Sequence, residues 1–243
     1  MIHIRTATFV LSLALATAAM PAIAQQAAAP KAPQDALTDP SLKGPEVIAF
    51  IGVKPGDKVA DVVGARFTRA LSQAVGPKGK LYAVETAEIA KTHPEAVKGA
   101  NAAAEAAVGH NIVVSTTPVN AMDLPKGLDA VFIRQNYHDL YDKFMGPADV
   151  PAFNKQVYDA LRPGGVYVIL DHSAVKGAPM TVTETLHRID RDRVVADVTK
   201  AGFKLDKESQ ILANPADPRD KMVFDPSIHG KTDQFLLRFR KPK

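Results

Sequence analysis

The chain contains no cysteine and no tryptophan, and it has no basic run interleaved with aromatic residues. Without cysteine, disulfide bonds, thiolate metal sites and cysteine nucleophiles are all excluded. The 30 basic residues are nearly balanced by 26 acidic ones, which leaves a formal net charge of +4 that is scattered along the chain. These features argue against a nucleic-acid partner.

The sequence also has no apolar run that spans a bilayer comfortably, which takes roughly 20 residues. Its most apolar stretch, residues 7–20, follows Arg5 and precedes a small-x-small cleavage site formed by Ala22 and Ala24. This arrangement is typical of a secretory signal peptide, here residues 1–24. We therefore expect a mature protein that begins near Gln25, has no stable membrane insertion, and is periplasmic or secreted.

Residues 25–40 are rich in Ala, Gln and Pro, which indicates a flexible leader, and residues 41–243 suit one domain of ordinary size. Within this domain, short apolar segments alternate with helical ones, which predicts a doubly wound α/β sheet. Strands are expected at residues 58–63, 80–85, 111–115, 128–134, 166–170, 203–212 and 234–240. Because no helix separates the last two strands, they are expected to form an antiparallel hairpin at one edge of the sheet.

Helices are expected at residues 42–51, 66–75, 87–108, 150–161 and 182–201. Pro94 and Gly99 are expected to break the third helix, and Thr181 and Glu184 form a capping-box pattern at the start of the last one. Acidic residues alternate with the basic residues of that helix, which predicts a solvated, salt-bridged face for Arg188, Arg191 and Arg193.

Three segments of the domain resemble class I S-adenosylmethionine (SAM) methyltransferases. Residues 58–69 form a strand, a turn and a helix, with Asp61 near the strand end and Gly64 in the turn, similar to the D-x-G-x-G-x-G-x-x-T opening of these enzymes. The G-P-x-G-x-L-Y-A-V-E segment at 76–85 resembles their second strand, and L-R-P-G-G-V at 161–166 resembles the turn before their fifth. The first segment departs from the pattern, because only Gly64 remains of three glycines and Asp61 lies two residues closer to Thr68.

Four further stretches resemble, more narrowly, a family of predicted secreted methyltransferases from bacteria. They are N-Y-H-D-L-Y at 136–141, D-H at 171–172, E-T-L-H-R-I-D at 184–190, and spaced N-P, F-D-P and G-K-T-D groups between 214 and 233. The likeness runs from about residue 42 to residue 242. It implies a Rossmann-like, doubly wound seven-stranded sheet of order 3-2-1-4-5-7-6, in which strand seven is antiparallel. It also implies SAM as the cofactor and methyl transfer to an O or N atom of a small molecule.

The same resemblance assigns cofactor contacts near the carboxyl ends of the first four strands, where an open α/β sheet binds its ligand. Gly64 would let the cofactor approach the backbone beside a helix N-terminus, Glu85 would accept hydrogen bonds from the ribose hydroxyls, and Asp123 would meet the adenine amino group. The implied cofactor-binding set is Asp61, Gly64, Glu85, Asp123 and Asn136. Gly64, Glu85 and Asp123 also have ordinary interpretations: a turn glycine, a solvated acid at a strand end and an acid in a loop, respectively.

Histidine and carboxylate side chains follow the fourth and fifth strands. His138 and Asp139 come after the fourth, Asp171 and His172 after the fifth, and His187 lies on the next helix. Neighbouring strands lie roughly 4.8 Å apart, so these side chains should meet at one rim and share a cavity. They could transfer protons to and from a substrate, since histidine titrates near neutral pH, or bind a divalent metal. Because no close-spaced pair such as H-x-x-x-H is present, we assign them to catalysis and assign no metal ligand.

Two alternatives stay open on the sequence alone. In the first, Asp171 and His172 cap strand ends, His138 packs against Tyr137 or Tyr141, and none carries chemistry. In the second, the protein is a non-catalytic or differently liganded periplasmic binding protein that kept the fold but lost SAM, because the glycine loop is short and SAM is made in the cytoplasm. Arg66 and Arg69 lie at the start of the helix after that loop. They would either pair with an anionic ligand or face water. The sequence specifies neither the substrate nor the oligomeric state.

Overall fold

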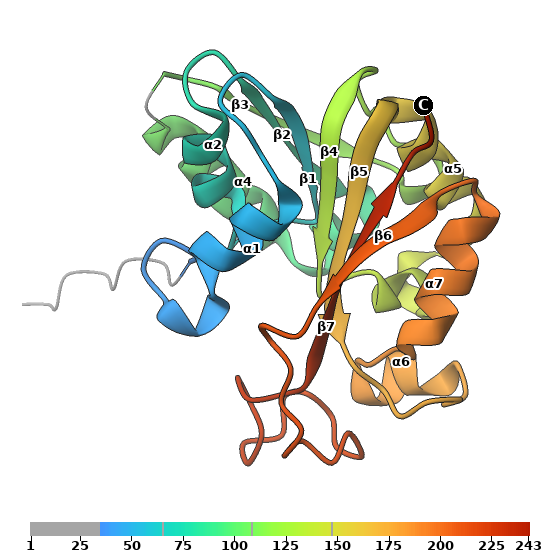
Figure 1. Ribbon diagram of the computed structural model, residues 1–243. Helices are drawn as coiled ribbons and strands as arrows, with labels where there is room; N and C mark the ends of the chain where they lie inside the picture. Colours follow the sequence, from blue (N-terminus) through green and yellow to red (C-terminus); the bar gives the residue numbers. More distant parts are fainter. Residues whose placement is uncertain (1–34, 65, 108, 147) are drawn as a thin grey trace, which may run out of the picture. The chain divides into compact units, whose positions relative to one another are not determined.

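The computed structural model describes residues 35–243 except residues 65, 108 and 147. The predicted signal peptide and residues 25–34 of the predicted leader lie outside the described residues. The described part contains a mixed sheet of seven strands in the order β3-β2-β1-β4-β5-β7-β6 (Figure 1). The expected seven-stranded, Rossmann-like α/β fold is therefore confirmed, including the antiparallel β7.

Short apolar runs form the strands, and the central strands are buried on both faces. In β4, Val131 and Ile133 belong to one hydrophobic cluster, while Ala130 and Phe132 belong to another, as the two-residue period of a strand requires. Because the first five strands run parallel, their carboxyl ends meet at one edge of the sheet. The strands are β1 (Lys58–Val62), β2 (Lys80–Thr86), β3 (Ile112–Thr117), β4 (Leu128–Arg134), β5 (Leu161–His172), β6 (Lys204–Ser209) and β7 (Gln234–Arg240).

Helices cover both faces of the sheet (Figure 1). One core includes residues of α1 (Gly44–Ile51) and α2 (Thr68–Val75), and the other includes residues of α3 (Ala87–Thr92), α5 (Val150–Ala160) and α7 (Arg191–Lys200). Within the described ranges, none of the helices combines the length and the apolar character that a bilayer crossing needs. The other helical elements are α4 (Pro94–Ala106), α6 (Thr181–Leu186) and the 3-10 turns η1 (Pro40–Leu42), η2 (Val119–Ala121), η3 (His138–Tyr141) and η4 (Lys143–Met145).

The helical region after β2 is interrupted at Pro94, as the sequence predicts, but it continues through Gly99, where a second break was expected. α3 ends before His93, and α4 begins at Pro94, since proline disfavours a helical conformation in the residue before it. The expected break at Gly99 is wrong, because Gly99 lies inside α4. A glycine there weakens the helix by about 1 kcal/mol relative to alanine and does not end it.

The single helix expected at residues 182–201 is two helices, α6 and α7, which corrects the prediction. His187 follows α6 in the left-handed conformation, with φ of 53°. The chain then runs beside the end of β5, where the Ile189 N–H donates to the His172 carbonyl oxygen at 3.0 Å. The expected capping box is also wrong, because Thr181 lies inside α6 and the N-cap residue, Met180, gives no side-chain hydrogen bond.

Candidate functional site

A cavity of about 330 Å³ lies at the carboxyl ends of β4 and β5. Its lining includes Arg134 and Gln135 from the end of β4 and His172 from the end of β5. Further lining residues come from η1 and from the long segment between β6 and β7, which includes Thr232. The cavity therefore occupies the edge of the sheet where open α/β folds bind their ligands.

The shortened loop after β1 is closed by its own carboxylate. Asp61 is fully buried, and its Oδ2 accepts a hydrogen bond of 2.8 Å from the Thr68 hydroxyl. A Cβ atom on Gly64 would lie 2.1 Å from the same oxygen, so glycine is required here to make room for Asp61. Val63 adopts φ of 50°, a strained conformation for a β-branched residue. The carboxylate of Asp61 thus fills the space over Gly64.

Glu85, near the carboxyl end of β2, has a carboxylate that no described residue pairs with. Its side chain is fully buried, and neither carboxylate oxygen has a hydrogen-bond donor among the described residues. Burial raises the pKa of Glu85 to about 8, and the Asp61 carboxylate adds to the shift. Burial likewise raises the pKa of Asp61 to about 6, against the effect of the Thr68 hydrogen bond. Since buried polar atoms in folded proteins are nearly always hydrogen-bonded, Glu85 lacks a donor that a ligand or water would supply.

The remaining two residues of the implied cofactor set lie differently. Asn136 donates from Nδ2 to the carbonyl oxygens of Arg134 (2.6 Å) and Val63 (3.4 Å), so it joins the end of β4 to the loop after β1. Asp123 is exposed in the segment between η2 and β4. Within the described part of the chain, Asp123 forms no hydrogen bond with the other four residues of the set, whereas Asp61 and Gly64 lie in direct contact.

His138 lies between two carboxylates at the centre of the histidine cluster. Its Nδ1 is 2.8 Å from Asp171 Oδ1, and its Nε2 is 3.1 Å from Asp139 Oδ1. The Asp171 carboxylate is held further by the backbone N–H groups of His138 and His172. Burial by itself lowers the pKa of His138, but the charges and hydrogen bonds of Asp171 and Asp139 outweigh burial and raise this pKa well above its usual value. His138 is therefore protonated at neutral pH and lies between the two carboxylates.

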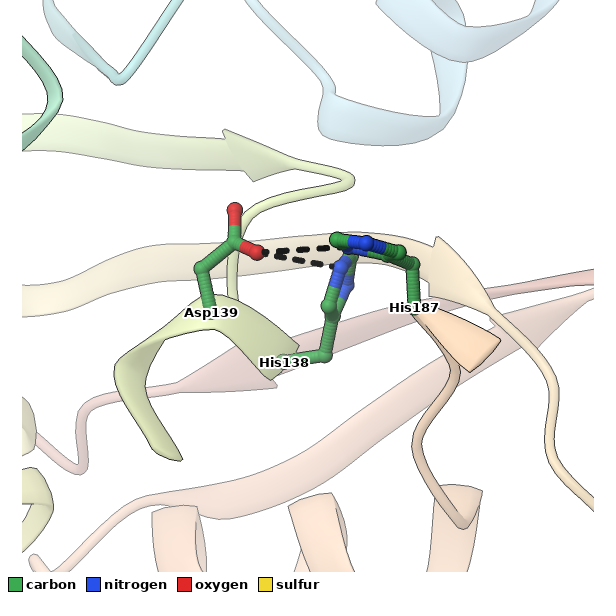
Figure 2. Close-up of side chains that lie close together, drawn as sticks. All are labelled: His138, Asp139 and His187. Carbon is green, nitrogen blue, oxygen red and sulfur yellow. Dashed lines mark ion pairs between the residues drawn. The ribbon is translucent and has the colours of Figure 1, made fainter. Parts of the chain in front are cut away.

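The three histidines expected to converge lie together. The ring of His138 is 6.3 Å from the ring of His172 and 5.5 Å from the ring of His187, which stands edge-on to it. Figure 2 shows His187 beside His138 and Asp139. His172 lines the cavity, whereas its lining does not include His138 or His187, so the expectation that the three histidines share this cavity is wrong. The His172 Nδ1 is 2.8 Å from the Thr232 hydroxyl, and burial, followed by the charge of His138, lowers the pKa of His172 well below its usual value.

The tyrosines beside His138 belong to a separate group. Tyr137 packs on Tyr141 with 6.4 Å between ring centroids, and the Tyr137 hydroxyl accepts a hydrogen bond of 2.9 Å from Asn154. The ring neighbours of His138 are the other two histidines. The structure therefore does not show the alternative in which His138 merely packs on a tyrosine.

Arg134 is a cavity residue that the sequence analysis does not single out. It ends β4, and its buried Nε has no hydrogen-bond partner among the described residues. Burial lowers the pKa of Arg134 to about 10, and the charge of Arg66 contributes, so Arg134 stays cationic at neutral pH. Its signal in the sequence is a charged residue that directly follows the apolar run at 130–133. Arg66 and Arg69 pair with Asp39 (3.3 Å) and Asp35 (2.9 Å).

The segment between β6 and β7 is anchored by Arg188, whose side chain is completely buried. Its guanidinium donates two hydrogen bonds to the Asp217 carboxylate (2.8 and 3.1 Å) and a third to the Lys221 carbonyl oxygen (2.9 Å). The expected solvated face is therefore wrong for Arg188, whereas Arg191 and Arg193 do form partly exposed salt bridges.

Several solved structures share this fold at low sequence identity. A SAM-dependent methyltransferase from Aquifex aeolicus matches with a TM-score of 0.57 and 22% identity, over 81% of this chain and 88% of that one. The N-methyltransferase NodS from Bradyrhizobium japonicum matches with a TM-score of 0.57 and 14% identity, over 84% and 98% of the two chains. The [4+2]-cyclase SpnF matches with a TM-score of 0.59 and 14% identity, over 83% and 80%. No family model and no curated protein matches the sequence. These similarities establish the methyltransferase-like fold, and the chemistry must be argued from the site.

Proposed function

We propose that this protein is an exported, methyltransferase-like protein that binds SAM near the carboxyl ends of β1 and β2 and acts on an O or N atom of a small molecule. The observation that carries the proposal is the buried, unpaired carboxylate of Glu85. Its two acceptor oxygens match the two hydroxyl donors of a ribose. The fold, which solved SAM-dependent methyltransferases share, supports the same assignment.

The shortened loop fits the cofactor less simply than Glu85 does. The Asp61 carboxylate lies over Gly64 and is bonded to Thr68, so a ligand can approach the Gly64 backbone only if Asp61 turns away. The loss of that hydrogen bond costs about 1 kcal/mol, which ligand contacts can offset. Glu85 would then hold the ribose, while Gly64 and the N-terminus of α2 would face the rest of the ligand.

His172 is the side chain best placed to accept a proton from the substrate. SAM supplies an electrophilic methyl group when it is bound. His172 faces the cavity, and in the tautomer whose Nδ1–H donates to the Thr232 hydroxyl, Nε2 is unprotonated and can accept the proton of a substrate O–H or N–H. Asp171 helps to position His172, because its carboxylate accepts a hydrogen bond from the His172 backbone N–H group.

Isothermal titration of the mature chain with SAM and with S-adenosylhomocysteine tests this function. We expect both to bind, with Glu85 ionised once the ribose hydroxyls donate to it. Glu85→Gln should weaken binding by about 1–3 kcal/mol, roughly 5- to 150-fold, because the amide offers one acceptor oxygen in place of two. Glu105→Gln, at an exposed position on α4, is the matched control and should bind as the unaltered protein does. If the unaltered protein binds neither compound, the SAM assignment is wrong. Unchanged affinity in Glu85→Gln would place the ligand elsewhere.

A binding protein for a small anionic molecule is the second candidate, and Arg134 favours it. A guanidinium with an unpaired Nε, in a cavity that also includes Arg66 and His172, suits a carboxylate or a phosphate. This function needs no SAM, so it is compatible with the closed loop at Asp61. Native mass spectrometry of the protein purified from its own host separates the two candidates. A bound anion that is lost in Arg134→Gln supports the second, and bound SAM or S-adenosylhomocysteine supports the first.

A further inference from the structure

The cluster around His138 brings together a set of donor groups that proton transfer alone does not require. One ligand atom each from His138, Asp139 and His187 lies within 4.8 Å of the other two (Figure 2). His138 and Asp139 begin η3, and His187 follows the end of α6, so two separate elements converge here. We propose that these three side chains bind one divalent first-row transition-metal ion through two histidine nitrogens and one carboxylate oxygen.

The separations between the donor atoms are near those around a bound metal ion. For ligands at about 2.0–2.2 Å in a tetrahedral arrangement, neighbouring donor atoms lie about 3.3–3.6 Å apart. His138 Nε2 and Asp139 Oδ1 are 3.1 Å apart, and His187 Nδ1 lies 3.9 Å from the same oxygen. The second separation is too long for a hydrogen bond. The His187 ring therefore flanks the carboxylate without closing on it and leaves a place for an ion.

The surroundings of His138 orient its Nε2 towards Asp139, so a metal ion would take the place of the proton between Nε2 and Asp139 Oδ1. The Asp171 carboxylate binds Nδ1 at 2.8 Å, and two backbone N–H groups hold that carboxylate in place. A metal-bound histidine commonly donates its other ring N–H to a carboxylate, which fixes the tautomer and the orientation of the ring. Asp171, whose side chain is fully buried, occupies that supporting position.

Buried negative charge around the cluster also favours a cation. Asp139, Asp142 and Asp171 are all more than nine-tenths buried, and Asp142 Oδ1 has no hydrogen-bond partner among the described residues. In the part of the chain that the structure describes, no lysine or arginine forms an ion pair with Asp139 or Asp142. The charge of Arg134 acts on Asp171, and also on Asp61 and Asp39, which lie outside the cluster. His138, which pairs with Asp139 and Asp171, supplies at most one positive charge to the three carboxylates. Because buried carboxylates are costly unless they are paired or coordinate a metal, a divalent ion suits this acidic pocket.

His187 gives the cluster an opening to solvent. Its side chain is 26% exposed, while those of His138 and Asp139 are almost completely buried. Phe224 packs on the His187 ring with 5.2 Å between ring centroids, and Phe224 and His172 both line the cavity. An ion entering past His187 would therefore lie behind the wall of the cavity and would tie η3 to the end of α6.

Calorimetric titration of the metal-free mature chain with Zn²⁺ tests the site directly. We expect one ion per chain, and Co²⁺ should give a visible ligand-field spectrum from the same site. Asp171→Asn should weaken Zn²⁺ binding about 10- to 100-fold, because the His138 ring loses its support. His187→Ala removes a ligand at a partly exposed position and should weaken binding more strongly than Asp171→Asn does.

His93→Ala is the matched control, because His93 is an exposed histidine outside the cluster. It should bind Zn²⁺ as the unaltered protein does, and circular dichroism of each metal-free variant checks that it is folded. Asp139→Asn, which also removes a ligand, serves in place of His187→Ala if that variant does not fold. The proposal is overturned if the unaltered protein binds no Zn²⁺, or if a folded variant without one of the three ligands binds it with unchanged affinity.

Discussion

Replacing Glu85 by glutamine should make the ligand-free protein less sensitive to rising pH. The Glu85 carboxyl group is buried without a donor among the described residues, and burial, followed by the charge of Asp61, raises its pKa from 4.5 to about 8. Glutamine has nearly the same shape and carries no charge at any pH. The substitution therefore removes the free-energy cost of ionising this position and leaves its packing almost unchanged.

The sign of the effect follows from the protons bound in each state. Between pH 4.5 and about 8, folded chains hold a proton on Glu85 that unfolded chains have released. The stabilisation is complete below pH 4.5 and is lost as the pH rises through about 8, so the free energy of unfolding falls with pH in this window. A pKa that rises from 4.5 to about 8 corresponds to at most about 5 kcal/mol. Water entry around the ionised carboxylate reduces this figure, and we expect about 2–4 kcal/mol.

Urea unfolding of the chain from Gln25, the predicted mature N-terminus, and of its Glu85→Gln variant, from about pH 5 to about pH 9, measures the difference. The two proteins should have similar free energies of unfolding at pH 5, and the variant should be the more stable by about 2–4 kcal/mol at pH 9. Glu105→Gln, at an exposed position on α4, should follow the unaltered protein at every pH. A difference between Glu85→Gln and the unaltered protein that stays constant with pH would refute the conclusion that Glu85 is a neutral, buried acid.

Three other measurements test the loop, the segment between β6 and β7, and export. Gly64→Ala should lower the free energy of unfolding by about 1–3 kcal/mol, because the new Cβ displaces the buried Asp61 carboxylate from its hydrogen bond. Gly99→Ala, in open space on α4, should instead raise it by about 0.5–1 kcal/mol, and equal effects would contradict the account of the loop. Arg188→Leu should cost about 3–5 kcal/mol in the same urea assay, because its buried carboxylate partner is left unpaired, and a loss below 1 kcal/mol would contradict this. Mass spectrometry of the protein purified from its own host should find Gln25 at or near the N-terminus, and a chain that retains its first residues would contradict export.

The strands were largely predictable, because a short apolar run bounded by turn residues has few other structures open to it. β4 and β7 begin and end at the residues that the sequence predicts. The hydrophobic periodicity of the sequence does not specify the order of the strands in the sheet. That order was predicted from the resemblance to methyltransferases. The break between α6 and α7 was missed, because the alternation of charges around Arg188 is typical of an exposed helix face. The burial of Arg188 depends on its pairing with Asp217, which lies 29 residues further along the chain.

The sequence by itself determined which side chains stand at the carboxyl ends of the parallel strands, because the alternation of strands and helices fixes where each strand ends. It therefore located Glu85 at the end of the strand beside β1 and brought His138 and His172 to one rim. Only the tertiary structure decided what each side chain meets there. Asp61 turns over Gly64, Glu85 has no donor within the described ranges, and His138 is held between two carboxylates with His187 beside it. Burial and pairing depend on segments far apart in the chain, so the charge state and the ligand capacity of these groups arise only when the fold brings those segments together.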